Sequence, residues 1–277
     1  MTQEERLRYL VERFKEDSGR WRNLPVGEST EEQRAALRSL MNVRMPRPLD
    51  SETLWVQDEY LHERAAEKGV VTLREIPTLR QLFGSSHPFA ERLSLWQGDI
   101  TRLGVDAIVN AANSQMLGCF QPLHNCIDNC IHSFAGVQLR QECARQMEAL
   151  RRRYGPDYEQ PTAVPMLTDG YNLPAGKIIH IVGPIVSGKL TDAHEQELKA
   201  CYRNVLELCA ENSLRSVAFC CISTGVFRFP PERAAEIAVE TVEDWLADHT
   251  EAMNRVVFNV HSEKSRVLYE MILRGNG

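Results

Sequence analysis

The stretch "SVAFCCISTGVFRFPPERAAEIAVETVEDWLAD", residues 216–248, decides the fold class. It opens with a nearly unbroken apolar run, which is typical of a strand buried on both faces of a sheet. A short loop follows, and then a helical segment with proline in its first turn. A buried strand, a loop and a helix in succession form the repeating unit of α/β proteins.

The same alternation extends on both sides of this stretch, from about residue 92 to the C-terminus. Further strands are predicted at "RLSLWQGD", "DAIVNAA", "AVPMLTDG", "KIIHIVGP" and "RVVFNVHS". Further helices are predicted at "CIDNCIHSFAGVQLRQECARQMEAL", "TDAHEQELKACYRNVLELCAEN" and "SEKSRVLYEMILR". We therefore expect an α/β domain over 86–277, with helices on both faces of its sheet.

Residues 1–85 have a different character and are predicted to form a helical N-terminal extension. "EERLRYLVERF" has apolar residues at helical spacing, and "STEEQRAALRSLMNV" opens like a capped helix with acidic residues in its first turn. "GSSHP" at 84–88 is interpreted as a linker. No catalytic constellation is visible in this region, and its arginines and glutamates are interpreted as a solvated helical face.

Composition limits the classes of function. The net charge of −6 argues against a general nucleic-acid binder, which normally carries a basic face. No apolar run is long enough for a membrane span, and the charged N-terminus does not resemble a signal peptide. We expect a cytoplasmic protein whose Cys143, and whose four cysteines between 201 and 221, are core thiols.

The stretch "GCFQPLHNCIDNC", residues 118–130, is dense in possible metal ligands. Cys119, His124 and Cys126 are three good zinc ligands within eight residues. Three protein ligands and one open position are typical of a catalytic zinc site. A chance cluster, or a nucleophilic cysteine paired with His124, is the alternative. Cys130 is a weaker candidate ligand.

Two neighbouring features are open to both a functional and a structural interpretation. Asp128 could activate water or bind a ribose hydroxyl, or it could be an ordinary acid in the first turn of a helix. His132 is expected to be packed or hydrogen-bonded within that helix. The loop "STGVFRFPPE" could bind an anion through backbone N–H groups, or it could be an ordinary turn with two core phenylalanines.

Taken together, several motifs in sequence order resemble a macrodomain, the ADP-ribose-binding α/β/α module. They are "LWQGDIT" (95–101), "DAIVNAANSQMLG" (106–118), "IDNCIHSFAG" (127–136), "TDGYNLPAGKIIHIVGP" (168–184) and "CISTGVFRFPPERAAEIAVETV" (221–242). The resemblance covers about 92–275 and implies a three-layer fold with a central mixed sheet. "GCFQPLHNCIDN" replaces the glycine-rich loop of most hydrolytic members. This replacement is similar to the zinc-dependent macrodomain class of microbial protein-ADP-ribose hydrolases, which also carries a helical N-terminal extension.

The resemblance implies a role for each matching residue. One zinc ion would be held by Cys119, His124 and Cys126, and Asp128 and Asn113 would be catalytic. Asp99 would accept a hydrogen bond from the adenine amino group, with Ile100 at the same end of the ligand. The other ligand contacts would be Asn113 and Phe229 at the distal ribose, and Ser223, Thr224, Gly225, Val226 and Phe227 at the diphosphate.

The activity that the resemblance implies is removal of mono-ADP-ribose from modified protein side chains, with ADP-ribose as the product. Zinc would orient and polarise the distal ribose, and Asp128 or a water molecule would supply the base or the nucleophile. Two alternatives stay open: a non-catalytic ADP-ribose reader, and a hydrolase of small esters such as O-acetyl-ADP-ribose.

Overall fold

The computed structural model describes residues 1–275 and contains a six-stranded mixed sheet. All neighbouring strands pair in parallel except β5, which pairs antiparallel with β6 at one edge. The strands in their order across the sheet are β2 (Leu93–Gln97), β8 (Arg255–Val260), β7 (Ser216–Phe219), β4 (Ala107–Ala111), β6 (Lys177–Ile181) and β5 (Met166–Asp169). The predicted α/β class and the central mixed sheet are confirmed.

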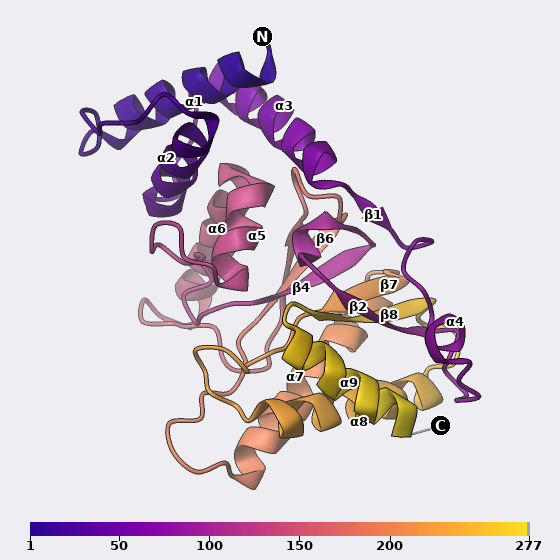
Figure 1. Cartoon of the computed structure of the whole chain (residues 1–277). Helices are drawn as coiled ribbons and strands as arrows, with labels where there is room; N and C mark the ends of the chain where they lie inside the picture. The colour runs from indigo at the N-terminus through magenta and orange to yellow at the C-terminus, as the bar shows by residue number, and fades with distance from the viewer. Residues whose placement is uncertain (276–277) are drawn as a thin grey trace.

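Helices cover both faces of the sheet, which gives the three layers expected (Figure 1). On one side lie α5 (Ile127–Ala135) and α6 (Val137–Tyr154). On the other side lie α7 (Asp192–Glu211), α8 (Pro231–Asp248) and α9 (Glu263–Gly275). The central strands β7 and β4 are buried on both faces, which explains their nearly continuous apolar sequence.

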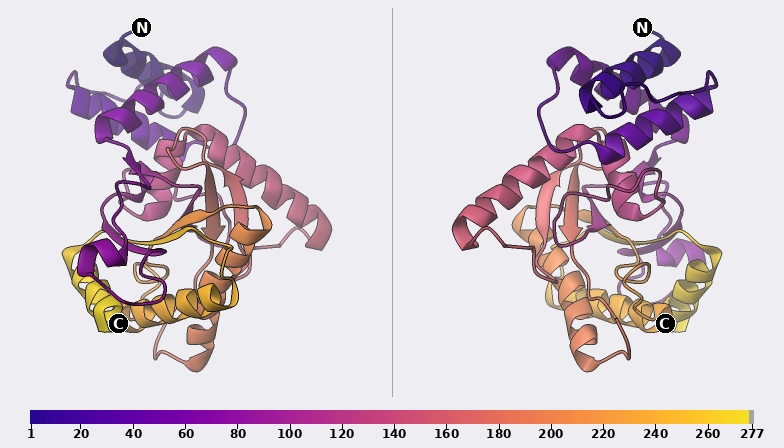
Figure 2. Two further views of the ribbon diagram at one scale, coloured as in Figure 1. Left: turned by 90° about the vertical axis from the view of Figure 1, so that its right-hand side faces the viewer. Right: turned by 90° about the vertical axis from the view of Figure 1, so that its left-hand side faces the viewer.

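The first three helices form a unit with its own small core. They are α1 (Gln3–Ser18), α2 (Thr30–Val43) and α3 (Ser51–Lys68), and capping boxes begin α1 and α2. The core of this unit is apolar and includes Leu7, Leu10, Val11, Phe14, Leu37, Leu40, Val56 and Leu61. The unit lies over α5 and α6, on the side away from the sheet (Figure 2). This packing places α2 and α3 next to the loops at the sheet edge.

The short segment after α3 joins the main domain rather than the extension. Strand β1 (Val71–Thr72) pairs in parallel with β3 (Leu103–Gly104). Ile76, and Leu79 at the start of helix α4 (Leu79–Phe83), are buried in the main core. Judged by the core that its residues join, the extension therefore ends with α3 and not at residue 85.

The single helix predicted from "CIDNC" to "MEAL" is two helices, because the chain turns at Gly136. This glycine has a φ of 98°, which interrupts the helical backbone. A Cβ atom there would lie 2.8 Å from Gln57 Nε2 on α3. The Oε1 atom of Gln57 accepts a hydrogen bond from the backbone N–H of Val137, at the first residue of α6. The break thus lets a side chain of the extension cap α6.

Within residues 1–275, no helix combines the length and apolar character that crossing a membrane requires.

Candidate functional site

The loops singled out in the sequence lie at one end of the sheet, beyond the carboxyl ends of its parallel strands. The loop after β4 runs from 112 to 126, and the loop after β7 runs from 220 to 230. These strands are neighbours, and the turn after β2 lies two strands further along the same edge. Ligands of open α/β sheets bind in this position.

Cys119, His124 and Cys126 come together in the loop between β4 and α5. Their ligand atoms all lie within 4.8 Å of one another, and all three residues are partly exposed. Cys119 Sγ lies 3.5 Å from His124 Nδ1. Two thiol sulfurs and an imidazole nitrogen are a donor set that suits zinc. The three residues fit the expected metal site, whereas the Cys130 Sγ atom points toward Arg38 Nη2, 3.6 Å away.

Cys126 also begins α5, because its Sγ atom accepts a hydrogen bond from the backbone N–H of Asn129 at 3.4 Å. Burial raises the pKa of the Cys126 thiol to about 12, although the hydrogen bond from Asn129 lowers it. Zinc binds the thiolate form of cysteine, so metal binding at this site would release protons.

Asp128 lies in the first turn of α5 and is 5 % exposed. Its Oδ1 atom accepts a hydrogen bond from Asn110 Nδ2 at 2.8 Å, and its Oδ2 atom lies 3.5 Å from Asn113 Nδ2. Asn110 lies in β4 and Asn113 lies two residues beyond its end, so the strand and the start of the following loop fix the direction of the carboxylate. Burial raises the pKa of Asp128 to about 6, against the hydrogen bond from Asn110 and the charge of Arg140. Such a carboxylate is suited to accepting a proton.

Beneath Asp128 lies a chain of buried polar groups that the sequence reasoning missed. Asn110 Nδ2 is 3.0 Å from His180 Nδ1, and His180 Nε2 is 3.0 Å from Thr168 Oγ1. Because the amide nitrogen only donates, His180 Nδ1 accepts and Nε2 carries the proton donated to Thr168. Burial lowers the pKa of His180 to about 3, so the ring is neutral at neutral pH. These hydrogen bonds to His180 and Thr168 fix the Asn110 amide that holds Asp128.

His132, Cys143 and His180 form a second group whose ligand atoms lie within 4.8 Å of one another, but all three residues are buried. His132 packs against Gly118, where a Cβ atom would lie 2.8 Å from the imidazole ring. Its Nε2 atom lies 3.5 Å from Asp128 Oδ1. Since His180 Nε2 is engaged by Thr168, we assign this group to packing beneath the metal loop.

Asp99 follows β2 and is engaged by the N-terminal extension. Its Oδ1 atom accepts hydrogen bonds from the backbone N–H and the hydroxyl of Thr101, at 3.0 and 2.6 Å. Its Oδ2 atom lies 2.7 Å from Lys68 Nζ, at the end of α3. Burial alone would raise the pKa of Asp99, but Lys68 and Thr101 hold it below its usual range. Lys68 also lies over the Phe134 ring, 3.5 Å from its centroid.

The interpretation of the extension's arginines and glutamates as a solvated face is wrong for Arg44, which is buried and paired with Asp17. It is also wrong for Arg38, which donates a hydrogen bond to the metal loop. The helical periodicity of the sequence could not show this, because the partners of these side chains lie far away in the chain.

The loop after β7 contains backbone N–H groups that are free to bind an anion. Ser223 has a φ of 64°, and a Cβ atom on Gly183 would collide with its Oγ atom. The close approach of these two segments therefore requires glycine at 183. Within the part of the chain that the structure describes, the backbone N–H groups of Gly225, Val226 and Phe227 have no protein acceptor. Three adjacent free donors can bind a diphosphate.

Two of the predicted ligand contacts do not agree with the structure. Phe229 is 1 % exposed and belongs to the main core, so its ring is not available to a ribose. The side chain of Ile100 is likewise buried, at 4 % exposed, which leaves only its backbone to face a ligand. Both residues are apolar and lie next to loops, and their sequence positions could not show on which side of the loop they pack.

Comparison with known proteins places the chain among related sequences. The Macro domain family matches residues 109–238. A protein from Treponema medium named "Protein-ADP-ribose hydrolase" is 47% identical over 99% of this chain and 100% of its own length. A protein of the same name from Staphylococcus aureus (strain Mu50 / ATCC 700699) is 42% identical over 97% of this chain and 95% of its own length.

Solved structures give the same picture of the fold. A Trypanosoma brucei macrodomain in complex with ADP-ribose has a TM-score of 0.64 and is 28% identical, covering 88% of this chain and 96% of the other. An Oceanobacillus iheyensis macrodomain mutant with ADPR has a TM-score of 0.58 and is 36% identical, covering 68% of this chain and 96% of the other.

Proposed function

This chain belongs to the macrodomain family, and we propose that it is a protein-ADP-ribose hydrolase that removes mono-ADP-ribose from modified protein side chains with the help of one zinc ion. The observation that carries the proposal is the juxtaposition of Cys119, His124 and Cys126, whose ligand atoms lie within 4.8 Å of one another, directly before Asp128. The full-length similarity to the two protein-ADP-ribose hydrolases supports the reaction class. A protein that only bound ADP-ribose would not need an accessible metal-ligand set.

A zinc ion bound here would act as a Lewis acid that orients and polarises the distal ribose at the bond to be cut. The protein's own part is to place a proton acceptor beside that bond. Asn110 and Asn113 hold the Asp128 carboxylate, which would take a proton from the attacking water. Asn113, at the start of the loop after β4, would direct the distal ribose toward Asp128.

The remainder of ADP-ribose would be bound at a distance from the reacting bond. The free N–H groups of 225–227 suit the diphosphate, and Asp99 would take the adenine amino group. Binding energy at the diphosphate and the adenine would position the ribose for reaction. The ammonium group of Lys68 lies beside the Asp99 carboxylate, so the two charges balance at the adenine end of the site.

The decisive experiment combines zinc analysis and single-turnover release of ADP-ribose from a mono-ADP-ribosylated protein on one preparation. We expect about one zinc per chain. Release should disappear after chelation and return when zinc is added. Magnesium added to the chelated protein is the matched control, and it should not restore release, because thiolate ligands favour zinc.

Other outcomes would change the proposal in defined ways. Tight ADP-ribose binding with no release from several linkage types would identify a reader. Release that survives complete zinc removal would leave a hydrolase in which the three ligands serve only to hold the loop. Faster turnover of O-acetyl-ADP-ribose than of any modified protein would identify a small-ester hydrolase.

Asp99→Ala should weaken ADP-ribose binding by about 10- to 100-fold, the loss expected for a hydrogen bond to a charged group. Zinc content should not change, because Asp99 is not among the metal-ligand residues. Calorimetric titration with ADP-ribose measures the effect. Asp99→Asn is the matched control, since it keeps an oxygen for Thr101 while losing the charge that pairs with Lys68. Unchanged affinity in Asp99→Ala would remove Asp99 from the adenine site.

A further inference from the structure

We infer that helix α2 of the N-terminal extension is a structural part of the metal site, with Arg38 and Asn42 as positioning residues for the loop that carries Cys119, His124 and Cys126. This inference rests on the proposed function, because it assigns α2 the task of holding that loop ready for zinc. The argument starts from the hydrogen bonds that cross from α2 to the loop.

Arg38 reaches the metal loop directly. Its Nη2 atom donates to the backbone carbonyl of His124 at 2.8 Å and to Asn129 Oδ1 at 2.8 Å. A guanidinium group only donates, so it turns the amide oxygen of Asn129 toward α2 and the amide nitrogen toward the loop. Arg38 therefore determines both the position of the His124 backbone and the orientation of Asn129.

Asn129 passes this constraint to the other two ligand residues. It is 0 % exposed, and its Nδ2 atom donates to the carbonyls of Cys119 and Gln121 at 3.3 and 2.9 Å. Its backbone N–H donates to Cys126 Sγ. All three expected zinc ligands are thus connected to Arg38 either directly or through Asn129, whose side-chain amide reaches Cys119 and whose backbone N–H reaches Cys126.

Asn42, one turn further along α2, holds the residue before His124. Its Oδ1 atom accepts a hydrogen bond from the backbone N–H of Leu123 at 3.1 Å, and its Nδ2 atom donates to Ser133 Oγ at 2.9 Å. Leu123 has a φ of 57°, a conformation that non-glycine residues rarely adopt without support from their surroundings. Asn42 supplies part of that support from the extension.

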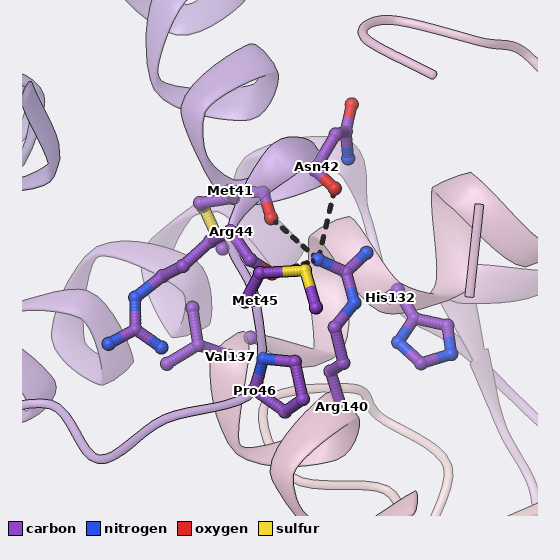
Figure 3. A pocket seen from close by; sticks show the side chains of 9 residues that line it. Met41, Asn42, Arg44, Met45, Pro46, His132, Val137 and Arg140 are labelled. Carbon is purple, nitrogen blue, oxygen red and sulfur yellow. Dashed lines mark hydrogen bonds between the residues drawn. The ribbon is translucent and has the colours of Figure 1, made fainter. Parts of the chain in front are cut away.

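A third link joins the end of α2 to the segment around Cys119. Arg140 on α6 donates through Nη1 to the carbonyls of Met41 and Asn42 at 3.1 and 3.0 Å, and it is drawn among these residues in Figure 3. Its Nε atom donates to the Leu117 carbonyl at 2.7 Å. The guanidinium also lies over the Phe120 ring, 4.2 Å from its centroid. Residues on both sides of Cys119 are therefore fixed to the same helix end.

These contacts matter because the loop from 112 to 126 contains no helix or strand of its own. An isolated loop would lose conformational entropy when it closes around a metal ion, and this loss weakens binding. Groups that orient the ligands of a metal site without touching the metal typically change its affinity by about 10- to 100-fold when removed. The extension thus acts as a scaffold of the site, beyond covering the α5–α6 surface.

Arg38→Ala should weaken zinc binding by about 10- to 100-fold, as measured by competition with a chromophoric chelator. Its release of ADP-ribose should recover as free zinc is raised, because the ligands themselves remain; a merely unfolded protein would not recover. Calorimetric binding of ADP-ribose should stay close to that of the wild type. Arg34→Ala is the matched control, since Arg34 lies on the same helix but pairs with Glu67 at 3.0 Å on the surface.

Arg38→Lys keeps the charge but not the planar fork, so a smaller shift in zinc affinity is expected. This variant also serves if Arg38→Ala does not fold. Equal zinc affinity in the wild type and in both Arg38 variants would overturn the inference and leave the proposed function intact. A wild-type protein that binds no zinc would overturn both together.

Discussion

Cys126→Ala removes the zinc ion and slows single-turnover release of ADP-ribose by about a hundredfold or more, the effect expected when a Lewis acid worth several kcal/mol is lost. One of the three ligand atoms that lie within 4.8 Å of one another disappears, and two ligands on a loop bind zinc poorly. ADP-ribose should still bind, because Asp99 and the loop at 225–227 are unchanged. Zinc analysis, single-turnover kinetics and calorimetry on the same variant test the three parts of the expectation.

The substitution also removes a helix cap, and a control must separate this effect from loss of the metal. Cys126 Sγ accepts the backbone N–H of Asn129 at the start of α5, and a lost cap costs about 1 kcal/mol. Cys126→Ser can keep that hydrogen bond, but a serine hydroxyl is a poor zinc ligand. Both variants should therefore lose zinc and activity. Cys130→Ser, which changes a thiol outside the ligand group, should keep them.

Two results would argue against this account of Cys126. Wild-type turnover in Cys126→Ala would exclude a catalytic zinc at this site. Full activity in Cys126→Ser together with loss of activity in Cys126→Ala would indicate that the residue matters as a cap and not as a metal ligand.

The features that the sequence predicts well are those encoded by neighbouring residues. The buried strand and helix of 216–248 are visible as an apolar run followed by a helical pattern, and β7 and α8 lie within it. The metal-ligand group could also be proposed, because Cys119, His124 and Cys126 are three good zinc ligands within eight residues of one loop. The break at Gly136 was not predicted, although a glycine inside a helical pattern is itself a local signal of a possible break. What the local sequence could not show is the partner of the Val137 N–H, because Gln57 on α3 lies 80 residues away in the chain.

The supporting residues could not be predicted, because their role depends on contacts between distant segments. Arg38 is 86 residues from His124, and Asn110 is 70 residues from His180. In the sequence, Arg38 and Lys68 look like any other charge on an amphipathic helix, and His180 looks like one polar residue in a strand. Only the packing of the extension against α5 and the pairing of β4 with β6 give these side chains their partners.

Asp128→Asn should lower the single-turnover rate by about 10²- to 10⁴-fold, the contribution typical of a general base. The amide can still accept the hydrogen bond from Asn110 with its oxygen, but it carries no charge and takes up no proton at neutral pH. Zinc content should be retained, because the ligand set of Cys119, His124 and Cys126 is untouched. Single-turnover kinetics at saturating zinc measure the loss.

The two carboxylates, Asp128 and Asp99, should then separate binding from chemistry. Asp128→Asn is expected to slow release with ADP-ribose affinity little changed, whereas Asp99→Ala is expected to weaken affinity with the rate at saturation preserved. This opposite pattern follows from their positions, since Asp128 lies beside the metal loop and Asp99 follows β2, further along the sheet edge. A rate for Asp128→Asn within about threefold of the wild type, far below the contribution of a general base, would exclude this carboxylate from the chemical step. The proton of the attacking water would then have to be accepted by the substrate or by a group at the metal.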